Sequence, residues 1–227
     1  MSVLQRVLTS VLLALCLAVL PVSVPTVVHA QTQKLTLHPN GFGPQSYAAW
    51  KAKEGLEDSE GDAQMALYFQ KMTATATNAA GLALITGLKG IPVASLTGLS
   101  WEHRLDGHCG AGAPRWSVLV LTASGQRRNL FLGCAAAVHS PGSAANWLRD
   151  SYAAPTIVAV GAANAGFGDP LSIADINGGT IQGLQIVFDE GNDVGQGFVF
   201  LDNITVEING VPHQWTGPMD NGGGVGN

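Results

Sequence analysis

Residues 197–210 read GFVFLDNITVEING, and this stretch predicts the closing strand of a β-sheet. Side chains alternate between the two faces of a strand. The even-numbered positions from 198 to 208 are apolar except for Asp202, so the alternation places a carboxylate on the face expected to enter the core. Burying a charge is costly unless the charge is paired or bound to a metal. Asp202 therefore needs a partner.

Further strands are predicted at short intervals along the chain. The clearest hairpin is residues 115–134, RWSVLVLTASGQRRNLFLGC, where two alternating segments flank a turn at Ser124-Gly125. Additional strands are expected within 64–72, 79–88, 95–103, 156–160 and 181–188, and a helical turn only within 143–152. About eight or nine short strands separated by Gly and Pro predict an all-β fold, an antiparallel β-sandwich of one domain.

The N-terminus has the layout of a secretory signal. One cation, Arg6, precedes an apolar run over 7–20, and Val28-His29-Ala30 supplies small residues for cleavage. The run is shorter than the roughly 18 residues of a membrane span. We expect a secreted protein with a signal peptide over 1–30, a β-sandwich domain over 31–216 and a disordered Gly-rich tail over 217–227. An uncleaved N-terminal anchor is the alternative.

Charge and cysteine content narrow the partners and the compartment. The chain has 11 Lys and Arg against 16 Asp and Glu, a net charge of −5, without a basic stripe. This composition argues against nucleic acid or an anionic membrane surface as a partner. Two cysteines remain after the expected cleavage, and an oxidising compartment favours a disulfide between Cys109 and Cys134.

Motifs typical of catalysis are missing from the sequence. There is no G-x-S-x-G, H-E-x-x-H or P-loop pattern. His103 and His108 flank Asp106, which offers a metal or triad fragment, but we interpret the segment as a polar loop before the disulfide. A glycosidase needs two carboxylates about 5–10 Å apart. Glu102 and Glu190 are candidates, but nothing in the sequence pairs them, so a non-enzymatic function is favoured.

Two features suggest ligands. Residues 54–62, EGLEDSEGD, hold five acids, which form either a solvated loop or a set of oxygen donors for Ca²⁺. The five tryptophans are each more often core residues than ligand platforms. Trp147 and Trp215 have polar neighbours in the sequence, so these two are the candidates for stacking on a sugar ring.

The closing stretch also carries a family resemblance. FVFLDNITVEING, preceded by IVFDEGND, resembles the last strands of secreted galactose-binding-like jelly rolls, which include many carbohydrate-binding modules. AWKAKEGLEDSEGDAQMALYFQK is similar to their opening strands and loop. The middle, with CGAGAPRW and FLGC, is more similar to uncharacterised secreted bacterial proteins. The resemblance implies an antiparallel β-sandwich of jelly-roll type.

The resemblance also implies a role for Asp202. In several such modules an Asp of the last strand and groups of an early loop hold a structural Ca²⁺, which here points to Asp202 with Glu57 and Glu60. Two alternatives stay open for Asp202: a salt bridge to Arg104 or Arg115, and hydrogen bonds from backbone N–H groups.

The sequence and the resemblance together favour one function over two others. We predict a non-catalytic module that binds a carbohydrate, either a polysaccharide or another cell-surface polymer or glycan. A structural or interaction protein of the cell envelope, without a sugar site, is the alternative. A glycoside hydrolase or lyase on the same fold is less favoured.

Overall fold

The computed structural model describes residues 34–57, 63–163 and 172–220. The strands are β1 (Thr36–Phe42), β2 (Ser46–Lys51), β3 (Ala66–Lys71), β4 (Ala80–Thr86), β5 (Leu96–Arg104), β6 (Arg115–Leu121), β7 (Arg127–Gly133), β8 (Val138–Pro141), β9 (Trp147–Ala153), β10 (Thr180–Phe188), β11 (Phe198–Ile208) and β12 (Val211–Trp215). The helices are α1 (Thr156–Ala163) and α2 (Ile173–Asn177), with 3₁₀ turns η2 (Val93–Ser95), η3 (Cys134–Ala136) and η4 (Pro218–Asp220). The predicted signal peptide and Glu60 lie outside the described residues. Of the predicted tail, the structure describes 217–220, which include η4.

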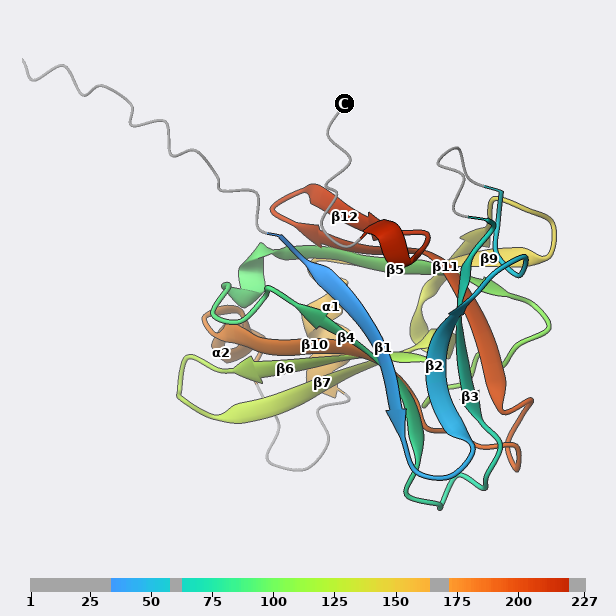
Figure 1. The fold of residues 1–227 in the computed structure, drawn as a ribbon. Coiled ribbons are helices and arrows are strands. Elements are labelled where there is room, and N and C mark those ends of the chain that lie inside the picture. The colour runs from blue at the N-terminus through green and yellow to red at the C-terminus, as the bar shows by residue number, and fades with distance from the viewer. Residues whose placement is uncertain (1–33, 58–62, 164–171, 221–227) are drawn as a thin grey trace, which may run out of the picture. The chain divides into compact units, whose positions relative to one another are not determined.

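The strands form two antiparallel sheets that pack against each other (Figure 1). One sheet has the strand order β1-β4-β10-β6-β7, and the other has the order β2-β3-β11-β5-β9-β8, with β12 paired to β11. Strands distant in the sequence thus lie side by side, as expected for a jelly roll. The predicted all-β antiparallel sandwich is confirmed.

The core lies between the two sheets. Trp101 of β5 and Trp116 of β6 stack across this interface with ring centroids 4.8 Å apart, and both are fully buried. The predicted hairpin forms as β6 and β7, and Val118 and Leu130 from its two strands enter the same core. Alternation in this hairpin was a reliable guide because each strand has one core face and one outer face.

The alternation of β11 changes phase at Asp202, contrary to the prediction. The register of β11 against β5 shifts between Asp202 and Thr205, and Asn203 has a positive φ of 48°. Before this bulge Leu201 faces the main core, and after it Ile204 does. A bulge adds one residue to a strand and so reverses which positions face inward. Asp202 therefore shares the outer face of the sheet with Phe200 and is not on the core face.

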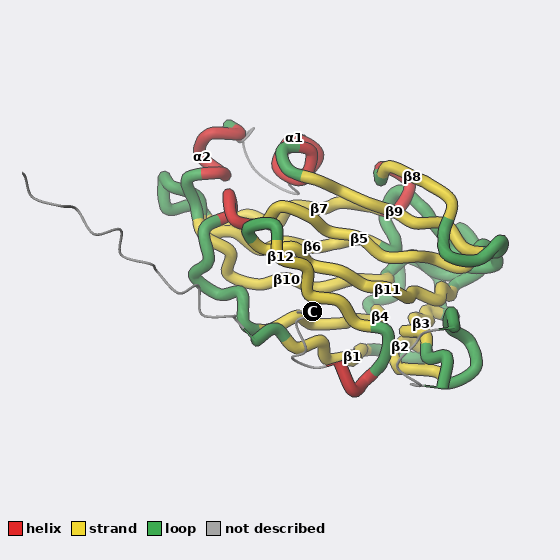
Figure 2. Tube along the Cα trace, turned by 90° about the horizontal axis from the view of Figure 1, so that it is seen from above, coloured by secondary structure: helices red, strands yellow, loops and turns green. Residues whose placement is uncertain are grey.

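Two further segments differ from their predicted secondary structure. Residues 156–160, predicted as a strand, lie in helix α1, which contacts β7 and β9 at the side of the sandwich (Figure 2). Residues 143–152, predicted to contain a helical turn, include β9 instead. In both cases tertiary packing overrides local preference: α1 buries Ile157 in the core, and β9 pairs with β5 on one edge and β8 on the other.

Candidate functional site

Asp202 is 2% exposed, and backbone N–H groups hold its carboxylate. The N–H of Leu56 donates to Oδ2 at 2.8 Å, and the N–H of Asn203 donates to Oδ1 at 2.7 Å. Gly55 lets the early loop approach this closely, because a Cβ there would lie only 2.7 Å from Oδ2. The early loop and the closing strand therefore meet, as the jelly-roll resemblance implies.

The two arginines considered as salt-bridge partners of Asp202 bind other carboxylates in this structure. Arg104 binds Glu54 and Asp106, and Arg115 binds Asp189. Of the alternatives weighed for Asp202, backbone hydrogen bonding is the one that the contacts support. Two N–H donors can stabilise a buried carboxylate without a metal.

The described residues supply few calcium ligands around Asp202. Glu57 is exposed and lines a surface hollow with Gln64, and Glu60 lies outside the described part of the chain. Within that part, the one cluster of three or more potential metal ligands does not include Asp202 or Glu57. Structural calcium at Asp202, Glu57 and Glu60 stays a prediction.

Chelation tests the calcium prediction. EDTA is expected to lower the melting temperature of the wild-type protein and Ca²⁺ to restore it, with Mg²⁺ less effective because Mg²⁺ demands a tighter octahedral shell. Asp202→Ala is expected to melt at a lower temperature and to stop responding to EDTA, as followed by circular dichroism. Unchanged melting of wild type in EDTA, with no metal by elemental analysis, would contradict the calcium prediction.

Neither predicted sugar-binding tryptophan offers a ring face in this structure. Trp147 is 4% exposed and packs with Leu56 and Phe200 in a small cluster on the outer face of the larger sheet. Trp215 is 1% exposed and belongs to the main core. The polar neighbours that nominated them in the sequence do not determine exposure, and stacking on either ring would first require it to be uncovered.

The structure does bring Glu57 and Trp147 to one place. Both line a hollow of about 610 Å³ between the early loop and the segment before β9. Arg104 ties part of this hollow together, since it donates to Glu54 at 2.6 Å and its guanidinium lies 3.8 Å from the ring centroid of Phe200. Lys53 and Glu57, which also line the hollow, are exposed. The hollow is thus partly filled by structural contacts between loops.

A larger groove, of about 670 Å³, crosses the outer face of the five-stranded sheet. Strand register builds it in rows: Val187 of β10 lies between Leu82 of β4 and Arg115 of β6. In the next row Gln185 of β10 pairs with Ser117 of β6, which pairs with Phe131 of β7. Further lining residues come from β1, from β7 and from the loop after β3, namely Phe42, Asn129 and Asn78.

Both polar and aromatic groups line this groove. Phe42 is 47% exposed, and Phe131 is partly exposed beneath the guanidinium of Arg115, whose Cζ lies 5.0 Å from the ring centroid. The amides of Asn129 and Gln185 stand among them. Aromatic rings beside amides are the groups that pack on the C–H face of a sugar and bind its hydroxyls.

The charged groups at the end of the groove are all paired. Arg115 makes a two-point contact with Asp189, in which Nη2 of Arg115 donates to Oδ2 of Asp189 at 2.7 Å. Glu190 contacts Nε2 of His108 at 2.7 Å and accepts the N–H of Ala113 at 3.1 Å. The described groove therefore presents ring faces and amides to a ligand, rather than a net charge.

Sequence reasoning missed the groove, although one signal for it was present. In the predicted strand 129–134, alternation assigns Leu130 and Leu132 to one face, so Asn129 and Phe131 belong to the opposite face. The sequence could therefore have predicted an exposed Phe beside an amide. The contributions of β10 and β4 could not be predicted, because the pairing of β10 with β6 and of β4 with β10 depends on the fold.

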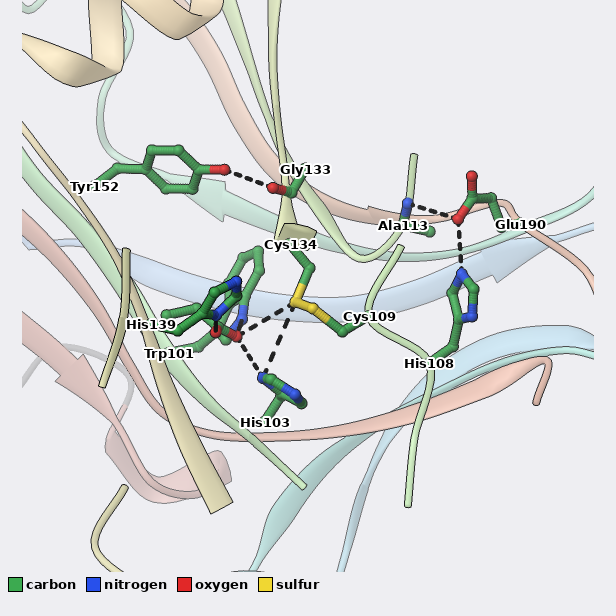
Figure 3. Close-up of a disulfide and its surroundings, with 11 residues drawn as sticks. Trp101, His103, His108, Cys109, Ala113, Gly133, Cys134, His139, Tyr152 and Glu190 are labelled. Carbon is green, nitrogen blue, oxygen red and sulfur yellow. Dashed lines mark hydrogen bonds and ion pairs between the residues drawn. A yellow bond between two sulfur atoms is a disulfide. The ribbon is translucent and has the colours of Figure 1, made fainter. Parts of the chain in front are cut away.

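The predicted disulfide is present, joining Cys109 and Cys134 (Figure 3). The predicted polar loop around it is partly wrong. His103 is buried on β5 and contacts Asp150, whereas Asp106 pairs with Arg104 and His108 pairs with Glu190. The histidines that flank Asp106 in the sequence thus belong to two separate networks.

Similarity to known proteins is found among solved structures. No protein-family model matches the chain, and no curated protein sequence matches it. The structure is similar to the family 11 carbohydrate-binding module of the cellulosomal cellulase Lic26A-Cel5E of Clostridium thermocellum, with a TM-score of 0.39 and 10% identity, covering 76% of this chain and 88% of the module. It is also similar to a β-1,2-glucanase from Parabacteroides distasonis, with a TM-score of 0.39 and 12% identity, covering 78% of this chain and 23% of the glucanase. Similarity of this degree does not assign a ligand or a reaction.

Among the residues that the structure describes, no helix is both long and apolar enough to cross a membrane.

Proposed function

We propose that this protein is a secreted, non-catalytic module that binds a neutral polysaccharide along the groove of the five-stranded sheet. The observation that carries the proposal is the groove itself, which is lined by the rings of Phe42 and Phe131 together with the side-chain amides of Asn129 and Gln185. Its volume, about 670 Å³, lies within the range of about 300–1,000 Å³ typical of ligand sites.

The pairing of charges favours a neutral ligand. Arg115 is matched by Asp189, and Glu190 is matched by His108 and two backbone N–H groups. An acidic polymer would have to compete with Asp189 for Arg115. A neutral sugar chain needs only ring contacts and hydrogen bonds, which the groove supplies without breaking an ion pair.

The same contacts support a non-catalytic role. A retaining or inverting glycosidase requires one carboxylic acid and one carboxylate on either side of the scissile bond. Glu190 and Asp189 are tied to His108 and Arg115. Glu102, the other nominated carboxylate, is buried elsewhere and accepts hydrogen bonds from Ser143 and Asn203. The favoured reading is therefore binding without hydrolysis.

Secretion is part of the proposal and rests on the sequence. The signal-like segment over 1–30 supplies the export signal, and the disulfide suits an oxidising compartment.

Affinity electrophoresis on gels containing neutral polysaccharides tests the proposal. Wild type is expected to be retarded by at least one β-glucan, mannan, xylan or galactan. Phe131→Ala and Gln185→Ala are each expected to weaken binding by about 5–30-fold, the equivalent of about 1–2 kcal/mol for a lost ring or hydrogen-bond contact. Leu105→Ala is the matched control, since Leu105 is 51% exposed and does not line the groove.

Three other outcomes would redirect the assignment. Failure to bind any neutral or acidic polysaccharide across a broad panel would favour a structural or interaction role in the cell envelope. Binding that persists in both groove variants would move the site elsewhere on the surface. Release of reducing ends from a bound polysaccharide would replace the binding module with a hydrolase.

A further inference from the structure

A buried polar cluster surrounds the disulfide on the core side of the larger sheet (Figure 3). Its centre is Asp150 of β9, which is 1% exposed. Oδ2 of Asp150 accepts the indole N–H of Trp101 at 2.7 Å and contacts Nδ1 of His103 at 2.5 Å. Oδ1 contacts Nδ1 of His139 at 2.7 Å. Neither the groove nor the proposed sugar binding uses this cluster.

The disulfide lies directly against these groups. Sγ of Cys134 is 3.4 Å from Oδ2 of Asp150 and 3.9 Å from Nδ1 of His103. One ligand atom from each of His103, Cys109, Cys134 and Asp150 lies within 4.8 Å of all the others. Two sulfurs, one imidazole nitrogen and one carboxylate oxygen form the kind of mixed donor set that binds zinc.

We propose that the reduced form of this protein binds one Zn²⁺ through Cys109, Cys134, His103 and Asp150, and that the disulfide and the metal are alternative occupants of one site. This site is independent of the sugar-binding groove. The disulfide excludes the metal because its sulfurs are bonded to each other and carry no thiolate charge. Reduction provides two thiols, which become thiolates when the metal binds, beside a nitrogen and an oxygen already in place.

The ligand separations fit tetrahedral coordination. With Zn–S bonds of about 2.3 Å and Zn–N or Zn–O bonds of about 2.1 Å, two ligand atoms of a tetrahedral site lie about 3.3–3.8 Å apart. Sγ of Cys134 is close to that separation from both of its neighbours. The contact between Nδ1 of His103 and Oδ2 of Asp150 has to open by about 0.8 Å, and the two sulfurs have to separate once their bond is broken.

The surrounding hydrogen bonds already orient the ligands. Trp101 and His139 contact the two oxygens of Asp150, which holds the carboxylate plane. The hydroxyl of Tyr152 donates to the carbonyl of Gly133, the residue before Cys134, at 2.5 Å. Burial, and then the nearby charge of Asp150, raises the pKa of Tyr152, so the hydroxyl keeps its proton. Outer partners of this kind are a general feature of metal sites.

The exchange of disulfide for metal balances in two steps. A dithiol reductant transfers two electrons and two protons to the Cys109–Cys134 bond, giving two cysteine thiols while the reductant becomes a disulfide. Zn²⁺ then displaces both thiol protons. The proton held between Nδ1 of His103 and Oδ2 of Asp150 moves to Nε2 of His103, which leaves both atoms free to bind the metal. Oxidation of the two thiolates by a disulfide-forming oxidant reverses the sequence and releases Zn²⁺.

Cobalt substitution tests the proposal, because Co²⁺ reports its coordination in the visible spectrum. The full chain, reduced with a phosphine and titrated with Co²⁺ without oxygen, is expected to show the intense absorption of tetrahedral cobalt and a thiolate charge-transfer band, at one ion per chain. Zn²⁺ is expected to abolish both. The oxidised protein is expected to show neither.

Two ligand variants, one outer-partner variant and one control locate the ligands. His103→Ala and Asp150→Asn are expected to lose the tetrahedral bands, and His139→Ala is expected to weaken Zn²⁺ binding about 10–100-fold as an outer partner. His38→Ala, a change at an exposed histidine of β1, is expected to bind like wild type. Unchanged spectra in His103→Ala and Asp150→Asn would overturn the assignment, because two cysteines alone would then explain the metal.

Folding is measured alongside the spectra, since the reduced chain loses a crosslink. If reduction unfolds the protein, Zn²⁺ is expected to restore the circular dichroism and the cooperative melting of the oxidised form, because binding to a folded site couples to folding. A reduced chain that stays folded without binding Co²⁺, or stays unfolded with excess Zn²⁺, would overturn the proposal.

Discussion

Lys71→Met is expected to destabilise the protein by about 3–5 kcal/mol, a large part of the 5–15 kcal/mol typical of a domain. Lys71 of β3 is 1% exposed. Its ammonium donates to three backbone carbonyls, those of Thr75, Thr77 and Asp189, at 2.8–2.9 Å. Hydrogen bonds from a charged donor contribute about 1.5–3 kcal/mol each, and methionine fills similar space without a donor.

Urea unfolding followed by tryptophan fluorescence measures this effect. Lys89→Met is the matched control, because Lys89 is exposed. The free energy of unfolding of this variant is expected to stay within about 0.5 kcal/mol of the wild-type value. Since Lys71 joins the loop after β3 to the end of β10, both of which line the groove, sugar binding is also expected to weaken. A Lys71→Met midpoint equal to that of wild type would show that water or rearranged loops satisfy these carbonyls equally well.

Removal of the disulfide is expected to have the second large effect. Cys109 and Cys134 are separated by 25 residues. In the loop-entropy model, closing a loop of this length with a disulfide stabilises the folded state by about 3–4 kcal/mol. Cys109→Ala/Cys134→Ala is therefore expected to unfold at a clearly lower urea concentration than the oxidised wild type, without zinc. Alanine avoids placing new hydroxyls beside Asp150.

Reduction provides the control for this comparison. A phosphine reductant is expected to shift the wild-type midpoint toward that of the double variant and to leave the double variant unchanged. Non-reduced peptide mapping is expected to find Cys109 linked to Cys134. Equal midpoints for oxidised wild type and the double variant would mean that the crosslink restrains a loop already ordered by its hydrogen bonds.

The predictions from the sequence were most accurate where a local sequence pattern and a single buried face indicate the same structure. The hairpin of β6 and β7 was read correctly because its alternation and its Ser-Gly turn point to the same structure. The disulfide was predictable for a similar reason, since only two of the three cysteines lie outside the signal-like segment and these two leave a single pairing. The sandwich class followed from strand spacing and from the resemblance of both ends to jelly rolls.

The predictions failed where partners from elsewhere in the fold decide the outcome. Residues 156–160 are rich in β-branched side chains, yet they form α1 because the position beside β7 and β9 has room for a helix with one buried side. Trp147 and Trp215 have polar neighbours in sequence, yet both are covered. Neighbours along a strand alternate between faces, so they do not report what packs on the ring itself.

Asp202 separates the two kinds of information most clearly. The sequence by itself determined that a carboxylate would be buried in the closing strand and that the early loop was the place to look for its partner. Only the tertiary structure decided which face Asp202 lies on, because the bulge at Asn203 reverses the alternation. This bulge lies where the strand partner of β11 changes from β3 to β12. The same limit applies to the groove and to the cluster around Asp150, since each joins strands that are neighbours only after the sheets have formed. Alternation and spacing are properties of one segment, whereas register, burial and the meeting of distant side chains are properties of pairs of segments.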